Sequence, residues 1–155
     1  FYKMNIFLRK ARLKDAVFIY NLKTSKEVIK TSIDRKKIKF KNHKIWLKKK
    51  LKDKNSLFFL INENRGKLKV GYVRLDFEGF YYRVTIAIIK NKTRLNYAHN
   101  ALKEVEKKIH SSKVLFAQVI KSNIKSVKLF KKANYIEIGS EKKIKFFFKF
   151  LGKNE

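Results

Sequence analysis

The sequence contains no cysteine, which excludes disulfides, thiol nucleophiles and cysteine-ligated metal sites. Its apolar runs are far shorter than the roughly 20 residues that a membrane-spanning helix needs. The first residues do not resemble a secretory signal, because their apolar patch is only a few residues long. We therefore expect a cytoplasmic protein without a membrane span.

Acidic residues are also scarce, with 12 Asp and Glu against 41 Lys and Arg and a net charge of +29. Proline is absent and glycine numbers only 5. An A+T-rich genome produces this bias toward Lys, Asn, Ile and Phe, and we favour that origin for most of the charge. It does not explain the shortage of acids, so a polyanionic partner such as nucleic acid or an anionic membrane stays open. A weaker form of the same interpretation is that the basic surface attracts a substrate that carries phosphate groups.

The apolar pattern predicts one domain spanning residues 1–155, with enough hydrophobic residues for a core. Strands are expected at 5–9, 56–61, 68–76, 81–89, 114–120, 135–139 and 144–150. Helices are expected at 14–22, 25–29, 43–52, 95–109 and 123–133. This order predicts an α/β (α+β) fold with a mixed, largely antiparallel sheet of about seven strands and helices on both faces.

The segment from Tyr81 to Ile109 is the centre of this prediction. A strand rich in β-branched and aromatic residues runs through a short polar loop into an amphipathic helix. The start of such a helix offers free N–H groups and the positive end of the helix dipole. The junction is therefore expected to cradle a phosphate or pyrophosphate.

Other stretches carry local predictions. Asn42 is expected to cap the third helix, on which His43, Trp46, Leu47 and Leu51 share one face. We favour core packing for Trp46. For His43 we favour core packing over a catalytic role by about 3:1. The segment 62–67 is predicted to be a turn. In the next strand, alternation places Val70, Tyr72 and Arg74 on one face and Gly71, Val73 and Leu75 on the other.

Several chemistries fit the sequence poorly. His43, His99 and His110 lie far apart without ligand partners at useful spacing, so no metal site is expected. The chain has no Walker loop, no Rossmann glycine pattern and no Gly-x-Ser-x-Gly elbow.

Three stretches resemble the GNAT family of acetyl-CoA-dependent N-acetyltransferases. FLRKARLKDAVFIYNL (7–22) is similar to the opening strand and helix of that family. HKIW (43–46), preceded by EVIKTS (27–32), resembles the amino-sugar N-acetyltransferases of pseudaminic-acid biosynthesis. VIKSNIKSVKLFKKANY (119–135) resembles the late family motif. The resemblance covers most of the chain, and it implies a GNAT-like sheet and acetyl-CoA as co-substrate.

The resemblance also implies a site. The cofactor-binding positions it assigns are Ile86, Ala87, Ile88, Arg94, Leu95, Asn96, Tyr97, Ala98, Asn123 and Phe130. The loop 94–99 lacks the family's glycines, and Phe130 stands where many relatives have a tyrosine that protonates the departing thiolate. Ser126 or a water would then supply that proton, while His43 and Tyr82 are candidates for the base by residue type only.

Three functions follow in decreasing order of preference. The first is acetyl transfer to the amine of a nucleotide-linked 4-amino sugar. The second is acetylation of a protein N-terminus, as in ribosomal-protein acetylation. The third is nucleic-acid binding on a catalytically decayed GNAT scaffold. The sequence makes no prediction of oligomeric state.

Overall fold

The computed structural model describes residues 5–63, 66–93, 96–109 and 113–152. Its strands are β1 Phe7–Lys10, β2 Ser56–Glu63, β3 Leu68–Phe77, β4 Tyr81–Ile88, β5 Lys113–Ile120, β6 Ile136–Glu141 and β7 Ile144–Leu151. Its α-helices are α1 Ala16–Lys23, α2 Lys26–Lys30, α3 Phe40–Lys52, α4 Tyr97–Glu106 and α5 Ile124–Lys132. Two 3₁₀ turns, η1 Leu13–Asp15 and η3 Lys90–Lys92, precede α1 and α4.

The strands form one seven-stranded sheet in the order β1-β2-β3-β4-β5-β7-β6. All neighbours pair antiparallel except β4 and β5, which run parallel. This single parallel pair is where α4 crosses between the two strands, as a parallel connection requires. The predicted mixed, largely antiparallel sheet is confirmed.

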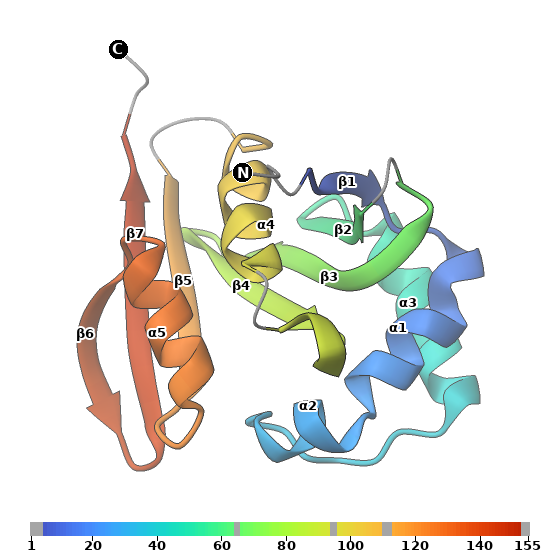
Figure 1. Cartoon of the computed structure of the whole chain (residues 1–155), viewed down its shortest axis with the longest axis horizontal. Coiled ribbons are helices and arrows are strands. Elements are labelled where there is room, and N and C mark those ends of the chain that lie inside the picture. Colours follow the sequence, from blue (N-terminus) through green and yellow to red (C-terminus); the bar gives the residue numbers. More distant parts are fainter. Residues whose placement is uncertain (1–4, 64–65, 94–95, 110–112, 153–155) are drawn as a thin grey trace.

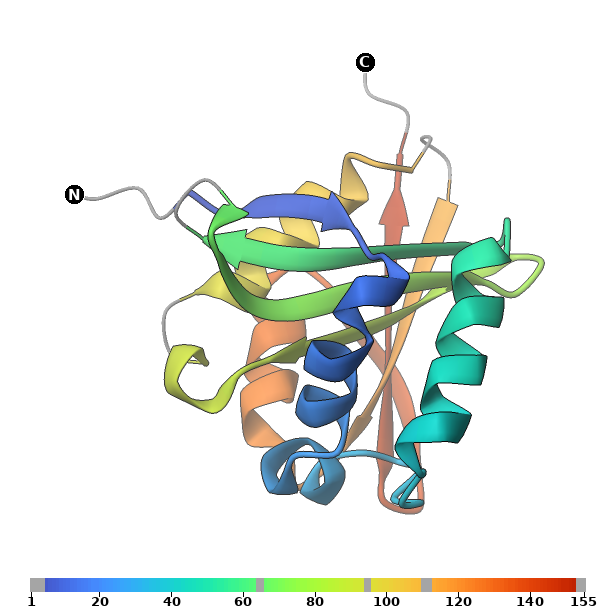
Figure 2. The same ribbon diagram turned by 90° about the vertical axis from the view of Figure 1, so that its right-hand side faces the viewer.

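Helices cover both faces of the sheet (Figures 1 and 2). On one face α4 and α5 bury Leu102, Val105 and Phe130 against the sheet. On the other face α1 and α3 bury Ile19 and Leu47. The face predicted for the third helix is buried at His43 and Leu47, as its periodicity indicated.

Three local predictions were wrong. The helix α3 begins at Phe40, not after Asn42, and Lys39 occupies the N-cap without a side-chain bond. The strand β2 extends to Glu63, so Asn62 and Glu63 belong to the sheet and not to the turn. Val70 packs with Val73 and Leu75 instead of with Tyr72.

A β-bulge causes this change of face. The partners of Ile61 and Asn62 are Gly71 and Lys69, so Val70 is the extra residue on β3. Gly71 fits here because a Cβ at this position would lie 2.2 Å from the Ala87 carbonyl oxygen. Gly71 thus allows the backbones of β3 and β4 to approach closely near the end of β4.

Candidate functional site

The two parallel strands at the centre of the sheet separate along their length. The strands β4 and β5 are paired only at Tyr81↔Val114, Tyr82↔Leu115 and Arg83↔Phe116. In the described residues, β4 continues to Ile88 and β5 to Ile120 without further pairing between them. In Figure 1 the strands lie together at the start of β4 and diverge beyond it. The second half of β4 thus has an open backbone edge inside the sheet.

The hydrogen bonds at both ends of β4 show which residues face this open edge. Glu78 N–H donates to the Tyr81 carbonyl (2.9 Å), and Ile89 N–H donates to the Val70 carbonyl (2.8 Å). Because alternate residues of a strand direct their backbone groups to opposite sides, the odd-numbered residues face β3. The N–H and C=O groups of Ile86 and Ile88 therefore point toward β5, whereas those of Ala87 point toward β3.

The start of α4 contributes further N–H groups. The first bond within the helix joins Asn100 N–H to the Asn96 carbonyl (3.0 Å), so the preceding N–H groups have no acceptor in the helix. Asn96 adopts the left-handed conformation (φ 59°), which Asn tolerates better than most residues. Its side chain accepts from Lys132 Nζ (2.8 Å), which places a cation at the helix start. Arg94 and Leu95 lie outside the described residues.

A buried carboxylate anchors the loop before α4. Glu63, 8% exposed, accepts from the Tyr97 hydroxyl and forms an ion pair with Lys92 (3.0 Å). Tyr97 is itself buried, so its ring points into the core and away from a ligand at the helix start. Sequence reasoning missed this network, because it assigned Glu63 to a turn and Tyr97 to direct cofactor contact.

The start of α5 holds two of the predicted site residues together. Asn123 Oδ1 accepts from Ser126 N–H (3.3 Å), and Asn123 Nδ2 donates to Ser126 Oγ (2.9 Å). The cap leaves the Ser126 hydroxyl proton free to donate elsewhere. Phe130 is 4% exposed and packs against Tyr135 and Phe147, so its side chain belongs to the core.

The structure does not bring the two candidate bases to the open edge. Tyr82 lies four residues before Ile86, about 13 Å along the strand, where β4 and β5 are still paired. His43 is 1% exposed on α3, among the rings of Tyr20, Phe40 and Trp46. Neither ring nitrogen of His43 has a hydrogen-bond partner of good geometry. Burial and then Lys23 lower the pKa of His43, while the Ala16 backbone opposes this, so we expect a neutral imidazole at pH 7.

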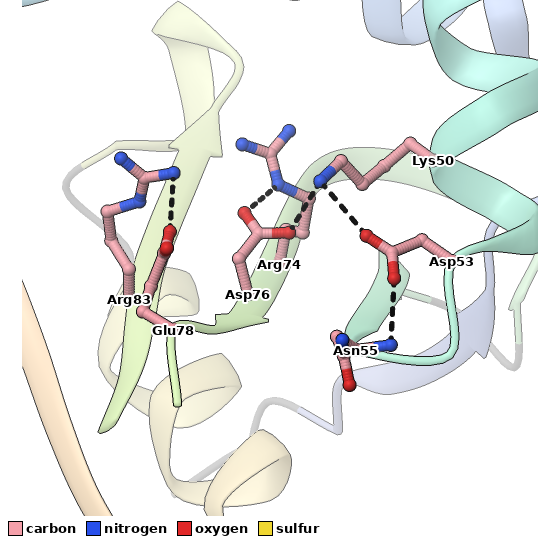
Figure 3. A network of polar contacts seen from close by, with 7 residues as sticks. All are labelled: Lys50, Asp53, Asn55, Arg74, Asp76, Glu78 and Arg83. Atoms are coloured by element: carbon pink, nitrogen blue, oxygen red, sulfur yellow. Dashed lines mark hydrogen bonds and ion pairs between the residues drawn. The ribbon is translucent and has the colours of Figure 1, made fainter. Parts of the chain in front are cut away.

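A charged network lies on the same face as α3 (Figure 3). Asp76 accepts from Arg74 Nε (2.7 Å) and pairs with Lys50 (3.0 Å). Lys50 also approaches Asp53 at 3.6 Å. Burial alone would raise the pKa of Asp76, but Arg74 and Lys50 outweigh it and the net shift is downward. The carboxylate is therefore ionised and shared by two cations.

Other sites are not evident in the part of the chain that the structure describes. Within that part, no three His, Cys, Asp or Glu side chains gather as metal ligands would. Nor is any described helix long and apolar enough to cross a membrane. A small hollow of about 130 Å³ lies near Lys10, Leu51 and Phe59, away from the open edge of β4.

Together, the sheet order, the separation of β4 from β5 and the helix that follows β4 define the fold of GNAT-type N-acetyltransferases. Solved structures share it over nearly the whole chain. A domain from Methanocaldococcus jannaschii DSM 2661 has a TM-score of 0.81 at 17% identity, covering 95% of this chain and 99% of that one. The spermidine N-acetyltransferase from Vibrio cholerae, in complex with CoA and spermine, has a TM-score of 0.79 at 16% identity, covering 93% and 94%. No protein-family model and no curated protein matches the sequence.

Proposed function

We propose that residues 1–155 form an acetyl-CoA-dependent N-acetyltransferase domain that acts on the amine of a nucleotide-linked 4-amino sugar. The observation that supports this most is the open edge of β4, flanked by the starts of α4 and α5. The fold it shares with an acetyltransferase solved with CoA supports the same class of reaction.

The residues at the open edge fit acetyl-CoA. Ile86 and Ile88 offer backbone N–H and C=O groups in the alternation that an extended chain of amides can pair with. The N–H groups at the start of α4, with Lys132 beside Asn96, suit a pyrophosphate. The missing glycines are compatible with this role, since Tyr97 turns its side chain into the core.

In the proposed reaction, acetyl-CoA supplies a thioester whose carbonyl carbon is attacked by the acceptor amine. The C–N bond forms, the C–S bond breaks, and the amine loses a proton while the thiolate gains one. The N–H of Ile86 or Ile88 would stabilise the charge that develops on the carbonyl oxygen. Ser126 would donate the proton to sulfur, because Phe130 has none. The described residues offer no side-chain base at this edge, so a water would carry the amine proton away.

The charge of the chain favours an anionic acceptor over a polyamine. Nine acidic side chains each lie within 4.0 Å of a Lys or Arg nitrogen: Asp15, Glu27, Asp53, Glu63, Asp76, Glu78, Glu104, Glu106 and Glu137. A polycation would have to compete with these internal cations for each carboxylate. A diphosphate-linked sugar would instead be drawn to the +29 surface.

The same charge favours a second candidate function, binding of RNA or DNA. Two titrations separate the candidates: acetyl-CoA and a short oligonucleotide, each by calorimetry at low and high salt. Micromolar acetyl-CoA binding that survives salt, followed by thiol release with a UDP-linked 4-amino sugar and not with spermidine, would support our proposal. Salt-sensitive oligonucleotide binding without acetyl-CoA binding would overturn it.

A further inference from the structure

Trp46 gathers two cations on the face of the sheet that α1 and α3 cover. Lys23 Nζ lies 4.3 Å from the centroid of the Trp46 ring, and Arg74 Cζ lies 5.1 Å from it. The two residues come from α1 and β3, so the arrangement depends on the tertiary fold. Both cations are held close to one indole despite their mutual repulsion.

The positive charge of this cluster is not balanced within the described residues. No carboxylate there lies within 4.0 Å of Lys23 Nζ, and the hydrogen bond of the Arg74 side chain uses only Nε. Figure 3 shows the terminal nitrogens of Arg74 pointing away from Asp76. Asp76 is moreover shared with Lys50. The cluster therefore has free N–H donors and excess positive charge, which are the requirements for binding an anion.

The position of the cluster relates it to the open edge of β4. Arg74 pairs with Thr85 across β3 and β4, so both side chains stand on the α1 and α3 face. The opposite face carries Ile86 and Ile88, which pack toward α4 and α5. An acceptor would therefore approach from the side of the cluster. Arg74 thus stands on the strand next to β4, and its guanidinium lies between Trp46 and the ring of Phe58, 5.6 Å away.

We propose that Lys23 and Arg74, held against Trp46, form the site that binds the phosphate groups of the acceptor. This inference rests on the proposed function for the identity of its ligand, while the anion site itself does not depend on acetyl transfer. The cluster holds the anion while the amine of the same molecule reaches the edge at Ile86 and Ile88. Acceptors without an anionic group are correspondingly poor substrates.

The direction of the pKa shift of Lys23 agrees with this assignment. Burial lowers the pKa of Lys23, and the charge of Arg74 lowers it further, while Asp34 acts in the opposite direction. When no anion is bound, the charge of Arg74 therefore makes it less favourable for Lys23 to carry its own charge. A bound anion would relieve the repulsion between Lys23 and Arg74.

Trp46 provides a direct test, because it is the only tryptophan in the chain. Inorganic pyrophosphate is titrated while the fluorescence of this indole is followed. We expect a saturable change in the wild type and an affinity at least about tenfold lower in Lys23→Gln. Lys48→Gln is the matched control: it removes the same charge from an exposed position on α3. Equal losses in the two variants, or no response in the wild type, would overturn the site.

Turnover distinguishes failure of the site from failure of the proposed function. In Lys23→Gln we expect a raised KM for the UDP-linked 4-amino sugar, with kcat and the KM for acetyl-CoA unchanged. The same amino sugar without its phosphates should be used equally by both proteins. An unchanged KM for the UDP-linked sugar would overturn the site and leave the acetyltransferase in place. Pyrophosphate binding that depends on Lys23, without any acetyl transfer, would support the site and overturn the function.

Discussion

His43 occupies a place where carrying a charge is costly. It is 1% exposed, lies among aromatic rings, and has neither nitrogen bonded. Its imidazole is enclosed by the rings of Tyr20, Phe40 and Trp46, which favours core packing over catalysis. Its role here is to fill the space between α1 and α3.

This environment predicts a specific pH dependence. The folded pKa of His43 is lowered below its ordinary value of 6.5, so the unfolded chain takes up a proton first as the pH falls. The contribution to stability is therefore complete above pH 6.5 and is lost as the pH falls through the folded pKa. His43→Leu should remove this dependence, unfold no more easily at pH 7, and keep kcat. Urea unfolding of both proteins at several pH values measures the stability, and a turnover assay measures kcat. A large loss of kcat in a variant that is as stable as the wild type would indicate that His43 is a catalytic residue.

Asp15 is a second buried charge, but it is fully partnered. Its carboxylate accepts from Arg9 (2.8 Å), Lys69 (3.0 Å) and the Arg12 N–H (2.8 Å). Burial alone would raise its pKa, but these partners lower it to about 2. The long-range contact with Lys69 depends on the pairing of β1 with β2 and of β2 with β3.

We expect Asp15→Asn to destabilise the fold by about 3 kcal/mol, because it leaves Arg9 and Lys69 without their carboxylate. About 3 kcal/mol is the low end of the cost of breaking a buried ion pair. We expect the low end because Arg9 and Lys69 still contact water. Stability from Asp15 is present above pH 3.8 and is lost as the pH falls toward 2. Asp53→Asn, at a half-exposed ion pair, should cost under about 1 kcal/mol. Denaturant curves of both variants test the account, and equal costs would contradict it.

At the scale of elements, the start of α5 combines a structural role with a predicted cofactor role. Both polar atoms of the Asn123 side chain are bonded to Ser126. We therefore expect Asn123→Ala to lower stability by about 1 kcal/mol and to weaken acetyl-CoA binding through the displaced helix start. Asn123→Ser keeps a good cap and should recover both properties. Calorimetry and thermal unfolding decide this: a stable Ser variant that binds acetyl-CoA poorly would show that the amide itself contacts the cofactor.

The elements themselves could be predicted because local residues determine them. The run 81–89 became β4, and the helix predicted at 25–29 became α2, which Ser25 caps by accepting from Val28 N–H. The errors arose where residues that are distant in the sequence determine the local structure. The bulge at Val70 depends on the pairing of β3 with β2, and Phe40 joins α3 where it packs on Tyr20.

The candidate site was only partly predictable for the same reason. The family resemblance implied Ile86, Ala87 and Ile88 as cofactor-binding positions, and in the structure they lie along the open edge of β4. Which of the three face that edge depends on the register with β3. The cluster of Lys23, Trp46 and Arg74 joins residues from three elements, and no local pattern could indicate it.

At the scale of the whole molecule, the charge of +29 gives a prediction about ionic strength. The rate constant kcat/KM for an anionic acceptor should fall as salt screens the attraction, while acetyl-CoA binding at backbone N–H groups should fall much less. Initial rates and calorimetry between low and high salt measure both. Loss of acetyl-CoA affinity as steep as that of an oligonucleotide would indicate that the charge, and not a defined groove, binds the cofactor.

The central claim is that the open edge of β4 binds acetyl-CoA through the N–H groups of Ile86 and Ile88. Amide hydrogen exchange by NMR, with and without acetyl-CoA, tests it residue by residue. We expect acetyl-CoA to slow exchange at Ile86 and Ile88 by at least about tenfold, and to change Thr85 and Ala87 little, because those already bond to β3. No change at Ile86 and Ile88, or an equal change at all four residues, would contradict the account.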